Sequence, residues 1–595
     1  MKAIKIISGR IIEFISGLSL RRKLYLGSFF VGLFSALAAV IMKNAIHFTA
    51  GFVAEHFNPG KGILFYIVIP PAGLILTYFF VKYIVKDDIS HGVSRILRSF
   101  SKGKSYLKAH NIWSPIVASS ITIGFGGSVG AEAPIVLSGS AIGSNIGKKL
   151  GLSYRYLTLL AGCGAAGAIA GIFKAPVAGI IFAIEVLMLD MTLSSIVPLL
   201  ISTVTAATVA WLLMGNSVLL SFTLKDTFNI KDIPWYLVLG LFTGLVAVWF
   251  TRITLFTERV YKLIENRTTR IITGSLILGL LIVLFPPFFG EGYTSIMGIL
   301  KEDFSGFNTI FKGFFSDTWL YLLVISGVMI LLKVVATSST NSAGGVGGVF
   351  APILFTGAIA GLFASLLLGK IFNPGIPAAG FVLAGMAGLM SGAMHAPLTA
   401  IFLIIEITGG YDLLIPLIIT STVSFIISRR FTEYSIYHIQ LASRGELVTH
   451  DKDKAILAIM DWTREIENDL ITIRPEAILG ELVRIISKSN RNIFPVVDEY
   501  RVFEGVVMLD DVREIMFDAS MYDKITMRDI MKIPPSYIDL SENVQVVMDT
   551  FEKTGAWNLP VLDKGLYAGY ISRSRIFSAY RDMLVEQFSE EQNIN

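Results

Sequence analysis

The chain has 595 residues, of which 53% are hydrophobic and only 16% are charged. Soluble chains carry about a quarter charged residues, so this composition excludes an ordinary soluble protein and predicts a membrane protein. The net charge of +5 is modest. Basic residues cluster beside apolar segments, as at Arg21 to Lys23, which is typical of cytoplasmic membrane flanks rather than of nucleic-acid binding.

Apolar segments recur throughout the first 445 residues. The first 23 residues lack the apolar core and cleavage site of a signal peptide, so none is expected. Several of the later segments are shorter than the roughly 20 residues of a simple span, which predicts a transporter with broken helices in mid-membrane. The strongest expected spans, in chain order, are 24–41, 63–85, 197–214, 235–250, 271–285, 320–335 and 413–427.

An internal repeat divides the membrane part into two halves. GSVGAEAPIVLSGSAIG from Gly127 aligns without gaps on GVGGVFAPILFTGAIAG from Gly345, and APVAGIIFAIE from Ala175 aligns on APLTAIFLIIE from Ala396. Such duplicated, glycine-rich breaks are where transporters place binding sites. The residues alone leave open whether the two halves run parallel or inverted.

The composition becomes mixed and polar after Gly445, which predicts a membrane domain over 1–445 and a soluble domain over 446–595. The soluble part also repeats, because the segment from Ile493 resembles the segment from Asn558. Each has two short β runs followed by a helix, so two small α/β modules packed as a pair are expected.

Five motifs, in order, resemble those of the CLC family of chloride channels and proton/chloride exchangers. They are GSVGAEAP at 127–134, FKAPVAGIIFAIE at 173–185, GGVFAP at 347–352, MHAPLTAIFLIIEITG at 394–409 and SIYHIQLASRG at 435–445. The resemblance implies an all-α polytopic membrane domain of two inverted repeats, followed by an α/β pair of CBS domains at about 467–520 and 528–585. It also implies a homodimer in a bacterial plasma membrane, with the CBS pair in the cytosol.

Glu132 is the strongest candidate functional residue. A carboxylate inside an apolar membrane segment is costly and therefore functional by default. Glycines such as Gly130 leave backbone N–H groups free, and helix N-termini aimed at one point can hold an anion without a cationic side chain. The resemblance implies that Glu132 gates the anion path; the alternative is a carboxylate that only caps a helix.

Further anion-binding residues are expected from the matching motifs. The resemblance makes Tyr437 the pore tyrosine, whose hydroxyl donates to the central anion, and brings the N–H groups of Val349 and Phe350 to the same site. His91 stands where many relatives have a chloride-binding serine. It is an anion ligand or a structural histidine with about equal weight.

The residues give opposing signals for the mode of transport. Exchangers of the family commonly have a second glutamate after the first, whereas Val186 follows Glu185 here. Valine cannot carry a proton, which favours passive, channel-like conduction over proton-coupled exchange. Glu185 and its repeat equivalent Glu406 are both expected to be structural.

The CBS resemblance implies a candidate site for an adenine nucleotide. Asp511 matches the acid that holds ribose hydroxyls and Ser572 is retained, but Met508 and Arg575 replace the other expected residues. Packing and subunit contact are the alternative roles for this domain, and the two missing residues favour them over nucleotide binding.

Two other functions compete with anion transport. A CBS-regulated magnesium or other cation transporter would need clustered acidic residues in its spans, and few are present. A CBS-bearing membrane sensor would have no use for the duplicated motifs. We expect no enzyme activity, no catalytic residue, no metal site, no required cofactor and no nucleic-acid partner, with chloride as the transported ion.

Overall fold

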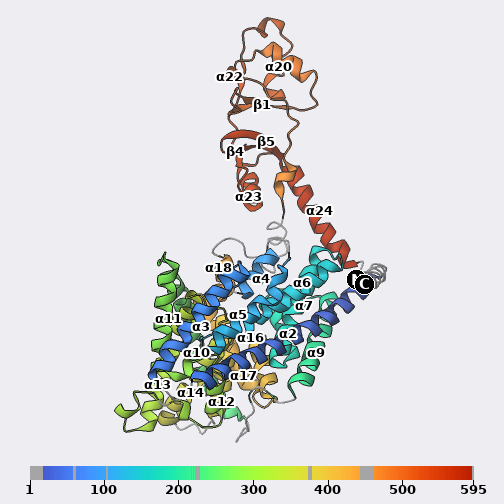
Figure 1. Cartoon of the computed structure of the whole chain (residues 1–595). Helices are drawn as coiled ribbons and strands as arrows, with labels where there is room; N and C mark the ends of the chain where they lie inside the picture. Colours follow the sequence, from blue (N-terminus) through green and yellow to red (C-terminus); the bar gives the residue numbers. More distant parts are fainter. Residues whose placement is uncertain are drawn as a thin grey trace. The chain divides into compact units, whose positions relative to one another are not determined.

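The computed structural model describes residues 18–592 except 58–61, 91, 102–104, 190, 216–217, 219, 221–227, 308, 373–377 and 443–459. The chain forms two compact units, Met1–Leu447 and Val448–Asn595. The first is helical and the second mixes helices with strands (Figure 1).

The helical unit contains two successive sets of helices. The first set is α2 (Leu20–Phe57), α3 (Ile63–Phe79), the π-helix η2 (Phe80–Val85), α4 (Gly92–Ser101), α5 (Ser114–Gly124), α6 (Glu132–Lys149), α7 (Tyr154–Phe173), α8 (Pro176–Glu185) and α9 (Leu193–Met214). The second set is α10 (Ile233–Lys262), α11 (Arg267–Leu284), α12 (Tyr293–Leu300), α13 (Thr318–Ser342), α14 (Phe350–Phe372), α15 (Ala378–Met394), α16 (Pro397–Thr408), α17 (Leu414–Phe431) and α18 (Ile439–Ala442).

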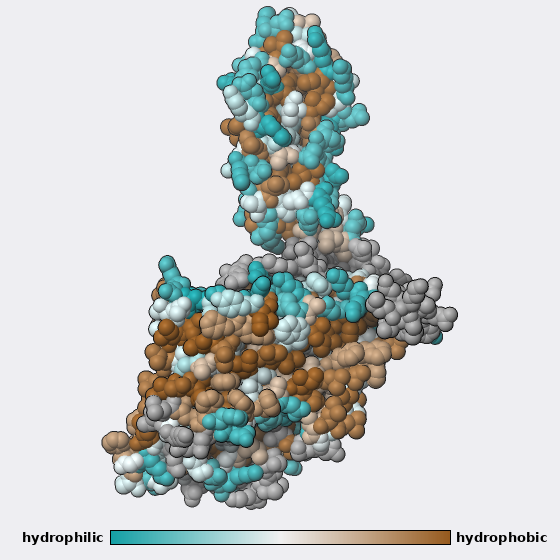
Figure 2. Space-filling view, viewed as in Figure 1, coloured by the Kyte–Doolittle hydropathy of each residue, from teal (hydrophilic) through white to brown (hydrophobic). Residues whose placement is uncertain are grey.

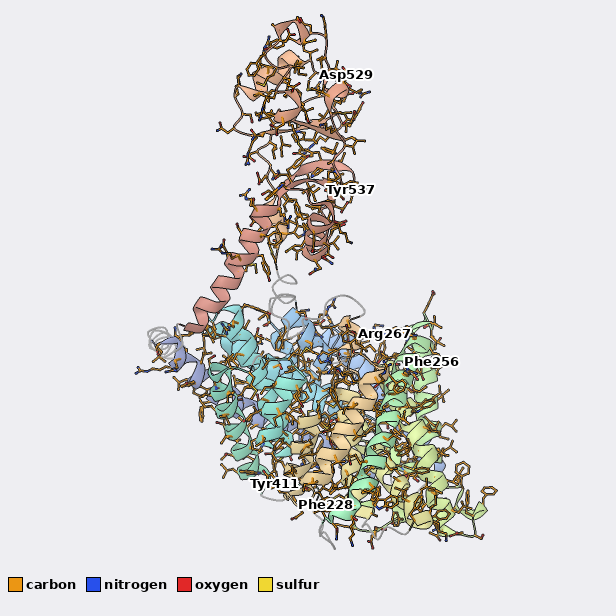
Figure 3. All side chains as sticks on the ribbon, turned by 180° about the vertical axis from the view of Figure 1, so that it is seen from behind. Phe228, Phe256, Arg267, Tyr411, Asp529 and Tyr537 are labelled. Carbon is orange, nitrogen blue, oxygen red and sulfur yellow. The ribbon has the colours of Figure 1, made fainter. Side chains whose placement is uncertain are left out.

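Among the residues described, nine helices are long and apolar enough to cross a bilayer. Hydrophobic residues form a broad band across the face of this unit that Figure 2 shows. Helix α10 crosses the unit, because Phe228 before it and Phe256 near its end lie at opposite ends (Figure 3). It has 30 residues and α2 has 38, so both are longer than the apolar segments in the sequence. The helices continue into polar flanks that hydropathy alone does not mark.

Helices α5, α8, α15 and α16 have between 10 and 17 residues. Helix α8 has only ten, about half of what a bilayer span needs. The sequence-based prediction of broken helices is confirmed. A helix too short to span the bilayer leaves polar backbone ends at membrane depth, where they need partners.

The two halves are inverted relative to each other at α8 and α16. Glu185, at the end of α8, accepts hydrogen bonds from the N–H groups of Leu398 and Thr399 at the start of α16, at 3.1 and 2.8 Å. Glu406, near the end of α16, accepts from Val177 and Ala178 at the start of α8, at 3.0 and 2.8 Å. Each helix therefore caps the other, which requires them to lie antiparallel.

Glycines that coincide in the repeat mark equivalent helix crossings. A Cβ atom at Gly143 of α6 would lie 1.9 Å from the carbonyl oxygen of Leu160 in α7. A Cβ atom at Gly361 of α14 would lie 2.1 Å from the carbonyl oxygen of Phe381 in α15. Both halves thus use glycine to bring two backbones into contact, as membrane helix pairs commonly do.

Replacing Gly361 by alanine is expected to destabilise the helical unit by about 1–3 kcal/mol, because the methyl group meets rigid backbone. Gly369→Ala in the same helix is the matched control, since nothing lies within 4 Å of its added Cβ. Thermal unfolding of both variants in detergent measures the difference. Equal melting temperatures would contradict the close helix approach.

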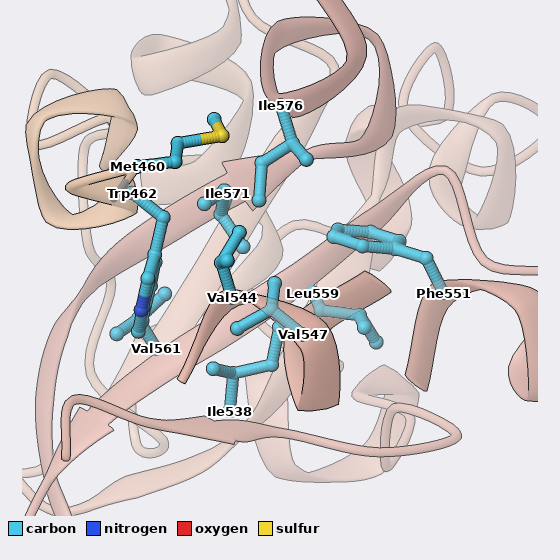
Figure 4. Close-up of a cluster of buried hydrophobic side chains, with 10 residues drawn as sticks. All are labelled: Met460, Trp462, Ile538, Val544, Val547, Phe551, Leu559, Val561, Ile571 and Ile576. Carbon is cyan, nitrogen blue, oxygen red and sulfur yellow. The ribbon is translucent and has the colours of Figure 1, made fainter. Parts of the chain in front are cut away.

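The second unit contains two similar modules. In the first, α20 (Leu479–Ile486) and α22 (Met527–Ile530) accompany an antiparallel pair of β1 (Ile493–Val497) and β2 (Phe503–Met508), with α21 (Leu509–Val512) after it. In the second, β3 (Ile538–Asp539), β4 (Asn558–Asp563) and β5 (Leu566–Ser572) form one sheet with α23 (Val544–Thr554) and α24 (Arg573–Gln592). Phe551, Leu559 and Ile571 are among the buried side chains of the second module (Figure 4).

The two modules pack directly against each other. The rings of Phe503 and Tyr567 stack with centroids 5.9 Å apart, and the N–H of Tyr567 donates to the carbonyl oxygen of Arg501 at 2.8 Å. One buried cluster combines Val497 and Val506 of the first module with Tyr567 and Tyr570 of the second. The expected pairing of two α/β modules is therefore confirmed.

Candidate functional site

The N-termini of α6 and α14 meet inside the helical unit. Just before these helices, Gly130 and Gly348 exchange two backbone hydrogen bonds, at 2.9 and 2.7 Å. A Cβ atom at Gly130 would lie 2.8 Å from Cβ of Ala351, and one at Gly348 would lie 2.9 Å from Cβ of Ala133. Each glycine thus contacts the first turn of the opposite helix, so two positive helix ends lie side by side.

Glu132 is the first residue of α6 and only 2% of it is exposed. Its Oε1 accepts a hydrogen bond from the hydroxyl of Tyr293 at 2.7 Å. Its Oε2 lies beside Ala351 at the start of α14 and makes no hydrogen bond of ordinary geometry with the described residues. A carboxylate oxygen therefore sits where two helix ends would otherwise attract an anion.

Tyr437 lies close enough to Glu132 for its hydroxyl to experience the carboxylate charge. The hydroxyl is buried and has no hydrogen-bond partner among the described residues. The backbone carbonyl of Tyr437 accepts from the Ser94 hydroxyl of α4 at 2.9 Å, which ties this segment to α4. A free buried hydroxyl next to the helix ends is an available donor for a bound anion.

The remaining predicted anion ligands are distributed around this point. Phe350 begins α14 and its ring stacks on Phe173 with centroids 5.5 Å apart, while Val349 is the residue before it. Gly92, the first residue of α4, would bring a Cβ to 2.5 Å from the carbonyl oxygen of Ala133. His91 lies outside the described residues, so its role stays a prediction.

The loop before α4 is anchored by Asp87. Its carboxylate accepts from Arg95 at 2.6 Å and from His110 at 3.0 Å, and it pairs with Lys108 at 3.1 Å. Partial burial opposes ionisation, yet the hydrogen bonds from Arg95, Lys108 and His110 hold the pKa of Asp87 well below its usual range. The cluster is a structural anchor for the start of α4.

Three polar residues near the site did not emerge from the sequence analysis. Lys333 of α13 is fully buried, donates to the Ser128 hydroxyl at 2.8 Å, and lies over the ring of Phe355. Glu291 accepts from the Ala131 N–H at 3.1 Å, and Tyr293 donates to Glu132. A lysine inside an apolar span is a visible signal, and Lys333 falls within the predicted span 320–335.

Val186 follows α8 and is fully buried. Glu185 before it is engaged with the start of α16, as described above, and also accepts from the Thr399 hydroxyl at 2.7 Å. Both oxygens of this carboxylate are therefore used in holding two helices together, in agreement with the expected structural role.

In the second unit the candidate nucleotide ligands are engaged by neighbouring side chains. Asp511 accepts from Lys532 at 2.6 Å. Ser572 donates to Glu467 at 3.2 Å. Arg575, which stands in the position of the second expected acid, pairs with Glu465 at 3.7 Å. A nucleotide would have to compete with these contacts.

Residues 72–429 match the family model described as voltage gated chloride channel. The chain belongs to this family. Two matches to the CBS domain follow, at 464–518 and 527–582. The membrane domain of the CLC family and a C-terminal CBS pair are thus both present, as the motifs predicted.

Relatives of known sequence are similar over the membrane part. A putative chloride channel protein ClcB-like from Ralstonia nicotianae is 27% identical over 382 residues, which cover 63% of this chain and 85% of that protein. A protein named voltage-gated ClC-type chloride channel ClcB from Escherichia coli is 29% identical over 332 residues, covering 55% of this chain and 75% of that protein.

Solved structures share the fold. A CLC-type fluoride/proton antiporter is 27% identical with a TM-score of 0.57, covering 70% of this chain and 97% of that one. A eukaryotic CLC transporter is 17% identical with a TM-score of 0.61 and covers 94% of this chain and 99% of that one. A slow cyanobacterial Cl⁻/H⁺ antiporter is 22% identical with a TM-score of 0.61, covering 72% and 99%. The likeness to the last two concerns the fold alone.

Proposed function

We propose that this CLC protein moves chloride across the membrane in exchange for protons, with Glu132 as both the gate and the outer proton acceptor. The observation that carries the proposal is the position of the Glu132 carboxylate. It lies at the meeting point of two helix N-termini, with one oxygen beside Ala351 that makes no hydrogen bond of ordinary geometry among the described residues.

The ionised carboxylate of Glu132 occupies the place of an anion and closes the path. When it takes up a proton, its attraction to the helix ends falls and chloride replaces it. The backbone N–H groups of Val349 and Phe350 and the hydroxyl of Tyr437 then hold the ion. The N–H of Gly130, expected from the sequence to be free, already donates to the carbonyl oxygen of Gly348. Because no cationic side chain contacts the ion directly, the ion can leave the site as well as enter it, which transport requires.

Passive conduction is the second candidate. It is favoured by Val186, which is fully buried and cannot carry a proton toward the cytosol. The names of the two ClcB relatives point the same way. Exchange is supported by the 27% identical neighbour, whose title names a proton antiporter. We place exchange first because an outer carboxyl alone can accept a proton and because water can replace a side chain on the inner route.

Reconstituted liposomes test the proposal. A chloride gradient is imposed at equal pH on both sides, and external pH and chloride are recorded together. Uphill proton movement driven by chloride is the expected result. Chloride flux without proton movement would establish passive conduction instead. Movement of fluoride but not chloride would identify fluoride as the transported ion. Movement of magnesium alone would contradict the hypothesis of anion transport.

The position of the CBS pair follows from the charge pattern. The last turn of α17, the final long membrane helix before the second unit, contains Arg429 and Arg430. Positive flanks mark the cytoplasmic side of a membrane helix. We therefore infer a plasma-membrane protein with its CBS pair in the cytosol, and a protease added to intact cells should leave the second unit uncut.

The CBS pair is proposed to bind an adenine nucleotide weakly. Asp511→Ala should lower the affinity of the full-length protein for ATP or AMP by roughly five- to tenfold, because one charge-assisted hydrogen bond to ribose is lost. Lys532→Ala is a useful comparison, since it frees Asp511 from its ion pair. Calorimetry that detects no binding by the wild-type protein would leave the domain with a packing role.

A homodimer with one pathway per subunit stays a prediction. Single-molecule photobleaching in bilayers should show two steps per particle; one step would contradict it.

A further inference from the structure

The segment before α12 lies along the loop that leads into α6. The N–H of Gly290 donates to the carbonyl oxygen of Gly126 at 3.3 Å. One residue later Glu291 accepts from the N–H of Ala131 at 3.1 Å, and two residues after that Tyr293 donates to Glu132 at 2.7 Å. Three consecutive contacts therefore join these two segments, which are about 160 residues apart in the chain.

The backbone at Gly292 makes this arrangement possible. Its φ of +90° is in the left-handed region, and a Cβ atom there would lie 2.6 Å from the ring of Phe355 in α14. The turn directs Glu291 to the residue before the gate and Tyr293 to the gate itself. The segment is thus built against both helices that form the anion site.

We propose that Glu291 and Tyr293 form an outer latch that sets the pH at which the gate carboxyl of Glu132 opens. The two residues act in opposite directions. When Glu291 is ionised it brings a second negative charge next to the gate, so each of the two carboxyls disfavours the ionised form of the other. The hydroxyl of Tyr293 donates to that ionised form and favours it.

Other charged and titratable groups face this cluster. Lys43 of α2 attracts Glu291, and Tyr437 lies near Glu132. Lys43 moderates the charge of Glu291. The unpaired Oε2 of Glu132 shows that the gate has no second hydrogen-bonding side chain among the described residues, so Tyr293 is the side chain that holds it.

Glu291 also accepts a backbone N–H at the start of α6. The N–H of Ala131 belongs to the residue that precedes α6, and groups at that position serve as anion donors at helix starts. Glutamine at position 291 can still accept this N–H through its amide oxygen, whereas the charge is lost. The variant Glu291→Gln therefore separates charge from geometry.

The latch rests on the proposed gating by Glu132, and its test is the pH profile of chloride flux from liposomes. Glu291→Gln should move the pH of half-maximal flux down by about one unit, because more acid is then needed to neutralise Glu132. Tyr293→Phe should move it up by about half a unit to one unit, because the ionised gate loses its donor. Glu55→Gln, at an exposed acid of α2, is the control and should leave the profile unchanged.

The outcomes distinguish the two proposals. If Glu132→Gln retains the wild-type pH profile, the gating role fails and the latch fails with it. If Glu132→Gln abolishes the profile but neither latch variant moves the midpoint, the latch alone is wrong. Shifts in the same direction would also overturn it, since they indicate general disturbance of the site. Should Glu291→Gln fail to fold, an unshifted midpoint in Tyr293→Phe is enough to overturn the latch.

Discussion

Glu132→Gln is expected to hold the anion path open at every pH. The amide has no charge to compete with chloride for the two helix ends, and glutamine keeps nearly the same volume. If the wild-type gate is closed nine-tenths of the time at alkaline pH, flux there should rise roughly tenfold. Chloride efflux from liposomes between pH 4 and 8 provides the measurement.

The same variant should also stop proton movement, because the outer proton acceptor is gone. Chloride flux without proton movement in this variant is therefore the result expected if Glu132 is both the gate and the proton acceptor. Glu55→Gln serves again as a control, because it removes an exposed carboxylate of α2. A Glu132→Gln protein whose flux still falls as pH rises would contradict the gating assignment.

Lys333→Met is expected to lower chloride flux by roughly tenfold. The lysine is fully buried and its ammonium donates to Ser128 in the loop that leads to Gly130 and Glu132. A cation buried beside this loop attracts an anion through surroundings of low dielectric constant. Methionine fills similar space without the charge.

Two comparisons isolate the charge of Lys333. Lys333→Arg should recover part of the flux because it restores the cation, although the larger head fits the space between Phe288 and Phe355 less well. Lys370→Met, at an exposed lysine of α14, should have no effect. Equal flux in Lys333→Met and wild type, with both eluting as the same folded species in detergent, would show that the buried charge does not support the anion.

The sequence by itself determined the parts of this protein that depend on contiguous residues. The glycine-rich motifs and the lone carboxylate of Glu132 are local, and the repeat places the equivalent glycine Gly348 in the second half. The change of composition after Gly445 likewise marked a soluble region. These features can be recognised without any knowledge of the fold, because each concerns one short segment.

Only the tertiary structure decided what surrounds Glu132. Tyr293 is 161 residues away from it in the chain, and Glu291 is 160 residues from Ala131. The reciprocal caps of α8 and α16 likewise revealed the inversion that an alignment of two halves cannot show. In a membrane, helix faces toward lipid and toward protein are both apolar, so periodicity does not tell which face is buried. Long-range polar contacts then show which helix faces meet, and these contacts form only when the chain has folded.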